Sequence, residues 1–509
     1  MAGTFWAFVP SLLAIVLALI TKQVYVSLLA GVILGALFAT GFSVTGSLNM
    51  IIVDGLSGAV SYLAGNLCFL VFLGILVAML NKSGGSAAFG RLAEKRIHSR
   101  VGVQFATFFL GILIFIDDYF NCLTVGSVMR PMTDRKKISR AKLAFLIDAT
   151  AAPICMIAPV SSWAAAVSGY AEETNSGITG IQMFIRSIPY NYYSLLTLVF
   201  IFVLILMKID YGPMAREEAK ARMAKKLNTS GEDGTDAGHE RGRTIDLILP
   251  IVVLVVAVFF AMLYAGGYFG PTPWIGGENQ GQLIAAFGDT DAFIALPIGA
   301  LVALLFAWIY FALRRTIRFR EMADCIPKGF MAMVPSILIL VLATALKTVT
   351  SALGAGDYVH DVMTGVSTGL YDMLPAIIFV VSVVLSFATG TSWGTFGILI
   401  PIVTSIFTPD SPLFFTGISA CLAGAVCGDH CSPISDTTIM SSAGAQVEHV
   451  LHVSTQLPYA LTVAGISFLT YIIAGFVQNV WVPLLCGTVL TIAVLWVIRF
   501  FYTKITVHL

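Results

Sequence analysis

Long hydrophobic runs, separated by short polar segments, follow one another along the whole of this 509-residue chain. A helix needs about 20 consecutive apolar residues to cross the roughly 30 Å hydrocarbon core of a bilayer. We therefore expect an all-α polytopic membrane protein with about eleven transmembrane helices. The runs that predict them lie near residues 5–21, 24–42, 56–80, 143–165, 188–208, 245–265, 291–312, 330–350, 415–445, 457–477 and 480–502.

Two further runs, 101–129 and 374–404, are too long for one straight span and too short for two. Each is interrupted near its middle by polar or glycine-rich residues. The first interruption is Asp117-Asp118, and the second is Thr389-Gly-Thr-Ser-Trp-Gly-Thr395. Backbone that leaves the helix at membrane depth is tolerated only where it lines a cavity or is buried in protein. The two interruptions therefore indicate functional segments.

The charges that flank these two runs differ in sign. Lys and Arg cluster on both sides of the first run, at 82–100 and 130–142. Positively charged loops stay in the cytoplasm, so the first run predicts a re-entrant hairpin that enters from that side. The flanks of the second run, 351–373 and 405–416, hold Asp but no Lys or Arg. We expect the second hairpin to enter from outside.

The two halves of the chain also share a motif. Pro153-Ile154 is followed by Ser161-Ser162, and Pro433-Ile434 is followed at the same spacing by Ser441-Ser442. Equivalent segments of opposite orientation are typical of the inverted-topology repeats of secondary transporters. The predicted organisation is an extra N-terminal span (1–23), a first inverted repeat (24–208) with a broken span at 143–165, a cytoplasmic linker (209–246), an extra span and outer loop (247–290), a second inverted repeat (291–478) with a broken span at 415–445, and a C-terminal span (479–509).

Composition agrees with a protein held in a lipid bilayer. Hydrophobic residues make up 58% of the chain and charged residues 11%, and mean hydropathy is +0.90, whereas a soluble protein carries about 25% charged residues. The net charge of +1 gives no indication of a nucleic-acid partner. The N-terminus lacks the basic segment of a signal peptide. We expect an N-terminus outside, a cytoplasmic C-terminus, and a solvated linker that is helical at Arg216–Lys226.

The Asp117-Asp118 pair is the first candidate site. A carboxylate at membrane depth must be protonated, hold a cation or pair with a base. Two adjacent carboxylates repel each other and titrate as a unit, which suits a site that exchanges a proton for a sodium ion. The alternative is that one of the two caps the N-terminus of a half-helix.

The second candidate is the polar sequence Gly428-Asp-His-Cys-Ser-Pro-Ile-Ser-Asp-Thr-Thr438. It supplies two carboxylates, several hydroxyls and, around Pro433, carbonyl groups that are freed from helical hydrogen bonds. Such oxygen ligands suit sodium, and the N-terminus of the following half-helix suits an anion. The alternatives are a proline kink with Asp436 as an N-cap, and a zinc cluster at His430 that lacks the usual ligand number and spacing.

Hydroxyl-bearing residues form the third candidate. Those of the 389–395 segment can coordinate sodium, although they can also be a helix-packing surface. Asp148 and Ser161-Ser162 correspond to Asp429 and Ser441-Ser442 and complete the first site, unless they only cap helices. The candidate ion- or substrate-binding residues are Asp117, Asp118, Asn121, Asp148, Ser161, Ser162, Thr389, Thr391, Ser392, Asp429, Ser432, Ser435, Asp436 and Thr437, with sodium expected at Asp117, Asp118, Thr391, Asp429 and Asp436.

Other polar and aromatic residues within the runs are assigned roles outside the site. Asn66, Asp54, Asp324 and Lys347 are interpreted as interfacial or capping residues. Trp6, Tyr193 and Trp481 are interpreted as parts of the aromatic belt at the membrane surface.

At these motifs the sequence resembles the NhaC-type sodium/proton antiporter family. The residues that carry the resemblance are Asp117-Asp-Tyr-Phe-Asn121, Thr133-Asp-Arg, Ser139-Arg-Ala-Lys142, Gly390-Thr-Ser-Trp-Gly394 and the 428–438 motif. The resemblance covers most of the chain and implies a homodimeric, sodium-coupled carrier of the bacterial inner membrane, related in architecture to elevator-type transporters. It also implies ion-binding roles for Asp117, Asp118, Thr391, Ser392, Asp429 and Asp436. The family includes sodium/proton antiporters, a malate/lactate carrier and amino-acid carriers, so the substrate stays open.

Two functions fit these residues. We expect sodium/proton antiport, with sodium and protons as coupling ions and no other cofactor. The alternative is sodium-coupled transport of a small organic solute, an amino acid or a carboxylate, in a pocket walled by Trp163, Trp393 and Tyr119. The absence of a buried Arg that could bind a carboxylate disfavours a dicarboxylate. A channel is disfavoured because inverted hairpins provide alternating access, and an enzyme because Ser161 and His430 are weak candidates for hydrolysis.

Overall fold

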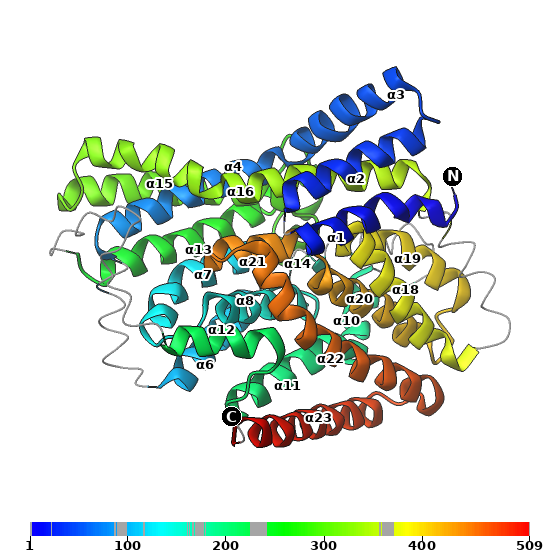
Figure 1. The fold of residues 1–509 in the computed structure, drawn as a ribbon. Helices are drawn as coiled ribbons and strands as arrows, with labels where there is room; N and C mark the ends of the chain where they lie inside the picture. Colours follow the sequence, from blue (N-terminus) through cyan, green and yellow to red (C-terminus); the bar gives the residue numbers. More distant parts are fainter. Residues whose placement is uncertain are drawn as a thin grey trace.

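The computed structural model describes residues 3–21, 23–85, 88, 99–115, 118–159, 161, 163–164, 167, 178, 180–223, 242–355, 358 and 371–507. Helices joined by short turns account for these residues, and no strand occurs among them, which confirms the predicted all-α class. Within a bilayer a helix satisfies its backbone N–H and C=O groups internally, so long apolar runs adopt it. The helices pack in two groups, in the upper and lower parts of Figure 1.

The first group contains the long helices of the upper part of Figure 1. α4 packs against α15 and α16, and α13 packs against α15. The α4–α16 contact is close at Gly329, where a Cβ atom would lie 2.4 Å from the backbone nitrogen of Ile75. The group comprises η1 (Phe5–Phe8), α1 (Val9–Thr21), α2 (Val24–Ala39), α3 (Val44–Asn49), the π-helical η2 (Met50–Ser57), α4 (Gly58–Lys82), α13 (Ile245–Ala265), η4 (Gly277–Asn279), α14 (Leu283–Gly288), α15 (Ala292–Arg314) and α16 (Phe319–Ala352).

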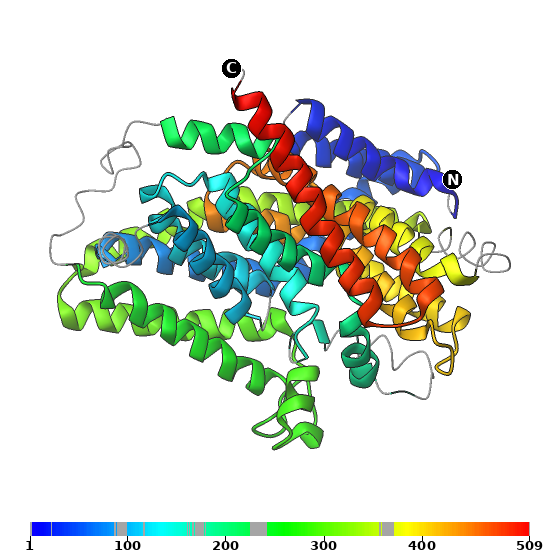
Figure 2. The ribbon, with the colours of Figure 1, turned by 90° about the horizontal axis from the view of Figure 1, so that it is seen from below.

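The second group surrounds a central helix, α20, in which all 18 residues are buried. α20 packs against α18, α19 and α22, and α23 lies along the outside of the group, as Figure 2 shows. The group comprises α6 (Arg100–Leu113), α7 (Asp118–Arg135), α8 (Arg140–Cys155), α10 (Gly180–Ser187), η3 (Ile188–Tyr190), α11 (Tyr192–Met207), α12 (Gly212–Met223), η5 (Tyr371–Met373), α18 (Leu374–Thr389), α19 (Ser392–Ile406), α20 (Phe414–Cys431), α21 (Asp436–Ala445), α22 (His449–Val477) and α23 (Trp481–Val507).

Helix breaks lie within the predicted polar segments. In the 101–129 run α6 ends at Leu113 and α7 begins at Asp118, and in the 374–404 run Gly390 and Thr391 separate α18 from α19. Gly390 has a left-handed φ of +67°, and a Cβ atom there would lie 2.6 Å from the carbonyl oxygen of Ile434. Only glycine fits such a turn without strain. That each helix pair is re-entrant in a membrane stays a prediction.

The helix lengths support a polytopic membrane protein. Among the described residues, seven helices are long and apolar enough to cross a bilayer, and nine if each of two bent pairs counts as one span. In one bent pair, Gln182–Tyr190 meets Tyr192–Met207 at 48°. Shorter apolar helices, such as Tyr25–Ala39, contain 10–17 residues. The count of eleven and the boundaries of the repeats stay predictions.

The first part of the predicted solvated linker is docked on the second group. α12 occupies Gly212–Met223, close to the helix predicted at Arg216–Lys226. Glu218 of α12 is only 2% exposed and accepts a 2.7 Å hydrogen bond from the backbone of Ser139. Lys142 is fully buried, and its Nζ pairs with Asp210 at 2.6 Å. These contacts fix residues 208–223 to α8, whereas residues 224–241 lie outside the described part of the chain.

Candidate functional site

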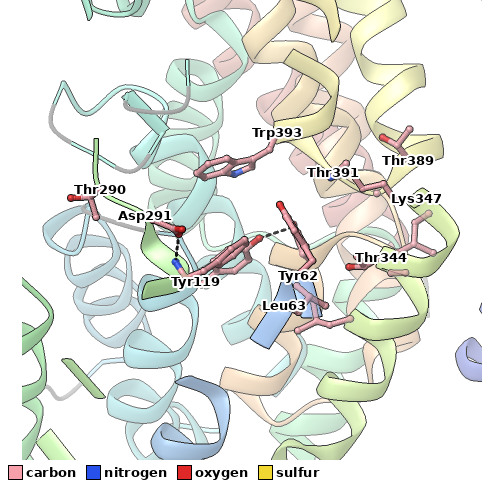
Figure 3. Close-up of a pocket in the computed structure, with 16 residues that line it drawn as sticks. Tyr62, Leu63, Tyr119, Thr290, Asp291, Thr344, Lys347, Thr389, Thr391 and Trp393 are labelled. Atoms are coloured by element: carbon pink, nitrogen blue, oxygen red, sulfur yellow. Dashed lines mark hydrogen bonds between the residues drawn. The ribbon is translucent and has the colours of Figure 1, made fainter. Parts of the chain in front are cut away.

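A cavity of about 230 Å³ lies where the break between α6 and α7 meets the break between α18 and α19 (Figure 3). Tyr119, the second residue of α7, lines it from the first break, and Thr389, Gly390 and Thr391 line it from the second. The remaining wall comes partly from α4, α15 and α16 of the first group. Segments far apart in the sequence, from both halves of the chain, therefore share one cavity.

Asp436 connects the two halves of the chain at this cavity. Its Oδ2 accepts a 2.6 Å hydrogen bond from the hydroxyl of Tyr119 on α7, and its Oδ1 accepts a 2.8 Å bond from the backbone N–H of Thr437. Asp436 is half-buried and forms part of the cavity wall. Its carboxylate is therefore held in place from two sides and still accessible from the cavity.

Asp429 lies in the last turn of α20 and is fully buried. Its Oδ2 accepts a 2.9 Å hydrogen bond from the hydroxyl of Thr437. Its Oδ1 has no hydrogen-bond partner among the residues that the structure describes. One oxygen of this carboxylate is therefore left for a proton or a cation.

Asp148 on α8 is the corresponding buried carboxylate of the first half. Its Oδ2 accepts hydrogen bonds from Nε2 of Gln456 at 2.6 Å and from the hydroxyl of Thr438 at 3.1 Å. Its Oδ1 has no hydrogen-bond partner within the described part of the chain, and Nε2 of His430 lies 4.0 Å from it. Thr437 and Thr438 are adjacent, so α21 links Asp148 with Asp429.

Two buried histidines complete this cluster. His452 Nε2 lies 3.8 Å from Oδ2 of Asp148 and 3.0 Å from Oε1 of Gln456, while His452 Nδ1 lies 2.9 Å from the hydroxyl of Ser442. His430 Nε2 lies 3.1 Å from the carbonyl oxygen of Asp148. We define the buried polar network as Asp148, Asp429, His430, Thr437, Thr438, His452 and Gln456, all of which are at most 2% exposed.

Comparison with known proteins identifies the family. A model of the Na+/H+ antiporter family matches residues 154–476. The chain belongs to this family. It is similar to an uncharacterized protein of Haemophilus influenzae, at 36% identity over 94% of this chain and 92% of that protein. It is also similar to the malate-2H(+)/Na(+)-lactate antiporter of Bacillus subtilis, at 29% identity over 39% of this chain and 42% of that protein.

Among solved structures, the YdaH transporter of Alcanivorax borkumensis matches at 13% identity with a TM-score of 0.36, over 94% of this chain and 99% of that chain. The family assignment and the apolar helices together make the protein a multi-pass membrane transporter of an antiporter family.

Several of the predicted site residues donate hydrogen bonds to backbone carbonyl groups at the helix breaks. Nδ2 of Asn121 donates to the carbonyl oxygens of Gly111 and Ile114, both at 2.7 Å, and so satisfies the end of α6. The hydroxyl of Ser161 donates to the carbonyl oxygen of Cys155 at 2.8 Å, just beyond α8. The contact of Ser161 agrees with its capping alternative, and the contacts of Asn121 show a similar use of a polar side chain that the sequence analysis did not consider.

The second half of the predicted site uses its serines similarly. The hydroxyl of Ser392 donates to the carbonyl oxygen of Ala425 at 3.1 Å, and that of Ser432 donates to the carbonyl oxygen of Phe387 at 2.8 Å. Ser435, and not Asp436, is the N-cap of α21, a position that favours serine. The serines thus tie α20 and α21 to the break beside α18, whereas Thr389 and Thr391 line the cavity.

The Asp117-Asp118 pair is described only in part. Asp118 is the first residue of α7 and is fully buried, next to the cavity-lining Tyr119. Asp117 and Ser162 lie outside the described residues. Trp163 is fully buried and does not line the cavity; it packs edge-on against Trp393, which does, with ring centroids 6.0 Å apart.

Sequence reasoning missed four residues near the site. Lys347, interpreted as interfacial, lines the cavity. Tyr193, interpreted as part of the aromatic belt, is 1% exposed, and its hydroxyl lies 3.2 Å from Nδ1 of His430; that interpretation is wrong. An aromatic residue at the end of an apolar run looks the same in sequence whether it faces lipid or protein. His452 and Gln456 were detectable, because polar residues four apart share one face of a helix.

Proposed function

We propose that this protein is a sodium-coupled secondary transporter that exchanges sodium for protons at the buried polar network. The observation that carries the proposal is the pair of fully buried carboxylates, Asp148 and Asp429. Each has one hydrogen-bonded oxygen and one oxygen without a hydrogen-bond partner among the described residues. An unpaired buried charge costs several kcal/mol, so Asp429 needs a proton or a cation, and Asp148 needs one of these or a protonated histidine, His430 or His452, which lie within 4.0 Å. Membership of the Na+/H+ antiporter family supports these two ions.

In this proposal sodium enters through the cavity and passes Asp436 on its way to Asp429. The hydroxyls of Thr391 and Thr437 supply further oxygen ligands, which a hard cation prefers. Protons occupy the carboxylates when sodium is absent, since a neutral carboxyl group no longer attracts a cation. Asp118, buried at the start of α7 beside Tyr119, contributes to the same exchange together with Asp117.

The proposed architecture follows the sequence analysis. It has eleven spans and two re-entrant hairpins in an inverted-topology repeat, in the inner membrane, with the N-terminus outside and the C-terminus in the cytoplasm. The charge of the flanking loops supports these orientations. We also propose a homodimer in which the second helix group moves relative to the first. The position of the cavity between the two groups supports such a movement, because a shift of one group against the other would change the side to which the site opens.

Sodium-loaded proteoliposomes that contain a pH-sensitive dye test the exchange. On dilution into sodium-free buffer, sodium leaves and protons enter, so the interior acidifies without any added organic compound. The Asp429→Asn variant should acidify at least about tenfold more slowly, because an amide neither carries the proton nor neutralises the cation. Asp54→Asn changes an exposed carboxylate of η2 and is the matched control. Wild-type rates in Asp429→Asn would exclude the assigned role.

A second candidate function is sodium-coupled transport of a small organic solute. The volume of the cavity, about 230 Å³, favours an organic solute. A single water molecule needs only about 10–15 Å³, and a sodium ion needs no more. The related protein of Bacillus subtilis, named as a malate-2H(+)/Na(+)-lactate antiporter, supports a carboxylate solute. A sodium gradient that changes internal pH only after an organic solute is supplied would favour this function over simple exchange.

A further inference from the structure

Lys347 is the one basic side chain among the described residues that line the cavity. It lies on α16, is half-buried, and its Nζ is 5.7 Å from the ring centroid of Tyr62. Within the described part of the chain, no carboxylate lies within 4.0 Å of this ammonium group. Asp436 on the same wall attracts this ammonium group through space, but no described carboxylate forms a contact ion pair with it. A partly desolvated ammonium group without a contact ion pair favours the binding of an anion.

Helix N-termini add to this positive charge. α7 begins at Asp118, α19 at Ser392 and α21 at Asp436, and each helix contributes a residue within its first turn to the cavity wall. The N-terminus of a helix carries a partial positive charge and favours negative groups. Three such ends from both halves of the chain therefore contribute to the wall that includes Lys347, and two of them begin with a carboxylate, Asp118 in α7 and Asp436 in α21.

The two carboxylates on the cavity wall already have local partners. Asp436 accepts hydrogen bonds from Tyr119 at 2.6 Å and from the backbone of Thr437 at 2.8 Å. Asp291 accepts a 2.8 Å bond from the backbone N–H of Phe293 as the N-cap of α15. The hydrogen bonds of both carboxylates go to groups other than Lys347, although Asp436 still attracts the ammonium group through space. The ammonium group lines the cavity without a contact ion pair among the described residues.

The rest of the wall suits a small organic body. Figure 3 shows the indole of Trp393 along one side of the cavity, opposite Tyr62 and Leu63. Buried Nε1 of Trp393 has no hydrogen-bond partner among the described residues, so it is available as a donor. Phe293 and Leu340 add apolar surface.

We propose that this cavity binds a small organic monocarboxylate whose charge pairs with Nζ of Lys347. The apolar wall holds the body of the molecule, and the single cation leaves no clamp for a second carboxylate. A buried charge-assisted pair of this kind is strong and selective. The inference rests on the proposed sodium-coupled transport, because it assigns a solute class and a specificity-determining residue to the same site.

The test uses the full-length protein in detergent, at constant sodium concentration and ionic strength. Tryptophan fluorescence follows the melting temperature with potassium propionate or benzoate, and with propionamide or benzamide as neutral matches. The acids should raise the melting temperature and the amides should leave it unchanged. Lys347→Gln should weaken the apparent affinity for the acids at least about tenfold, and Lys347→Arg, which keeps the charge, should retain most of it. Amides that bind as well as the acids, or wild-type affinity in Lys347→Gln, would overturn the assignment.

Sodium/proton exchange in proteoliposomes separates this inference from the function on which it rests. Wild-type protein that exchanges sodium for protons but binds no carboxylate refutes the inference and leaves the exchange intact. Wild-type protein that binds carboxylates but shows no sodium-driven pH change refutes simple exchange and keeps the role of Lys347. A folding defect in Lys347→Gln does not affect the comparison of acids with amides, which needs only the wild-type protein.

Discussion

The cavity and the buried polar network meet at α21, but the polar side chains of the two regions have different kinds of partner. Asp436 of α21 faces the cavity, whereas Thr437 and Thr438 turn into the network. In the network, donors such as Gln456 bind one oxygen of each carboxylate inside the protein, while the Oδ1 atoms of Asp148 and Asp429 have no hydrogen-bond partner among the described residues. At the cavity, Lys347 faces open volume. We therefore expect a side chain in the network to contribute to stability as well as to the proposed ion binding, and a side chain at the cavity to act mainly on the proposed binding of a solute.

The largest expected difference between the two regions is in the stability lost when a glycine is replaced by alanine. A Cβ atom on Gly444, beside the network, would lie 2.3 Å from the carbonyl oxygen of Cys122 on the facing helix α7. One on Gly394, beside the cavity, would meet only the ends of side chains, Cγ2 of Thr391 at 3.0 Å and Cε of Lys347 at 3.4 Å. Backbone cannot move away as a flexible side chain can.

We expect Gly444→Ala to lower the free energy of unfolding by about 3 kcal/mol or more, as overpacking does in a closed interior. Gly394→Ala should change it by no more than about 1 kcal/mol. Melting temperatures in detergent, with size-exclusion profiles, measure both. Equal losses in the two variants would mean that the cavity wall is packed as tightly as the network.

A smaller difference in the free energy of unfolding is expected when a polar side chain is replaced by an apolar one. Gln456→Leu removes the donor to Oδ2 of Asp148 and the 2.9 Å bond to the carbonyl oxygen of His430. The cost should be about 2–3 kcal/mol, because buried acceptors lose their partners. Thr391→Val removes only a long N-cap contact of 3.5 Å to Gly394 and should cost about 1 kcal/mol or less. Thermal melts in the same detergent compare the two, and a reversed order would contradict the contrast between the regions.

The sequence predicted where polar segments interrupt the apolar runs, and the structure has helix breaks there. Carboxylates and glycines inside an apolar run are expensive unless they line a cavity, so position alone identified Asp429, Asp436 and Thr391 as residues near the site. Whether each of them binds an ion stays a prediction. The same reasoning did not separate serines such as Ser432, which hydrogen-bond to backbone, from residues that face the cavity.

Lys347 shows what a single sequence leaves open. A lysine within an apolar helix reaches the membrane surface with its long side chain as readily as it reaches an internal cavity. The structure distinguishes these two positions of the lysine, because Lys347 on α16 lines the same cavity as Gly390 at the break after α18. These two residues are distant in sequence, so the sequence alone does not bring them together. The number of spans was also hard to predict, because α1 and α2 are apolar but have only 13 and 16 residues, fewer than the roughly 20 that cross a bilayer.

The smallest expected effect lies at the border between the two regions. Tyr119→Phe keeps the ring, which is 6% exposed, and removes the 2.6 Å hydrogen bond to Oδ2 of Asp436. Because Asp436 faces the cavity, water can replace the lost hydroxyl, so the free energy of unfolding should fall by less than about 1 kcal/mol. In proteoliposomes the sodium concentration for half-maximal exchange should shift about two- to threefold, since one donor to that carboxylate is lost. If Tyr119→Phe destabilises the protein as much as Gln456→Leu does, water does not replace the lost hydroxyl. Asp436 would then belong to the buried polar network and not to the cavity wall.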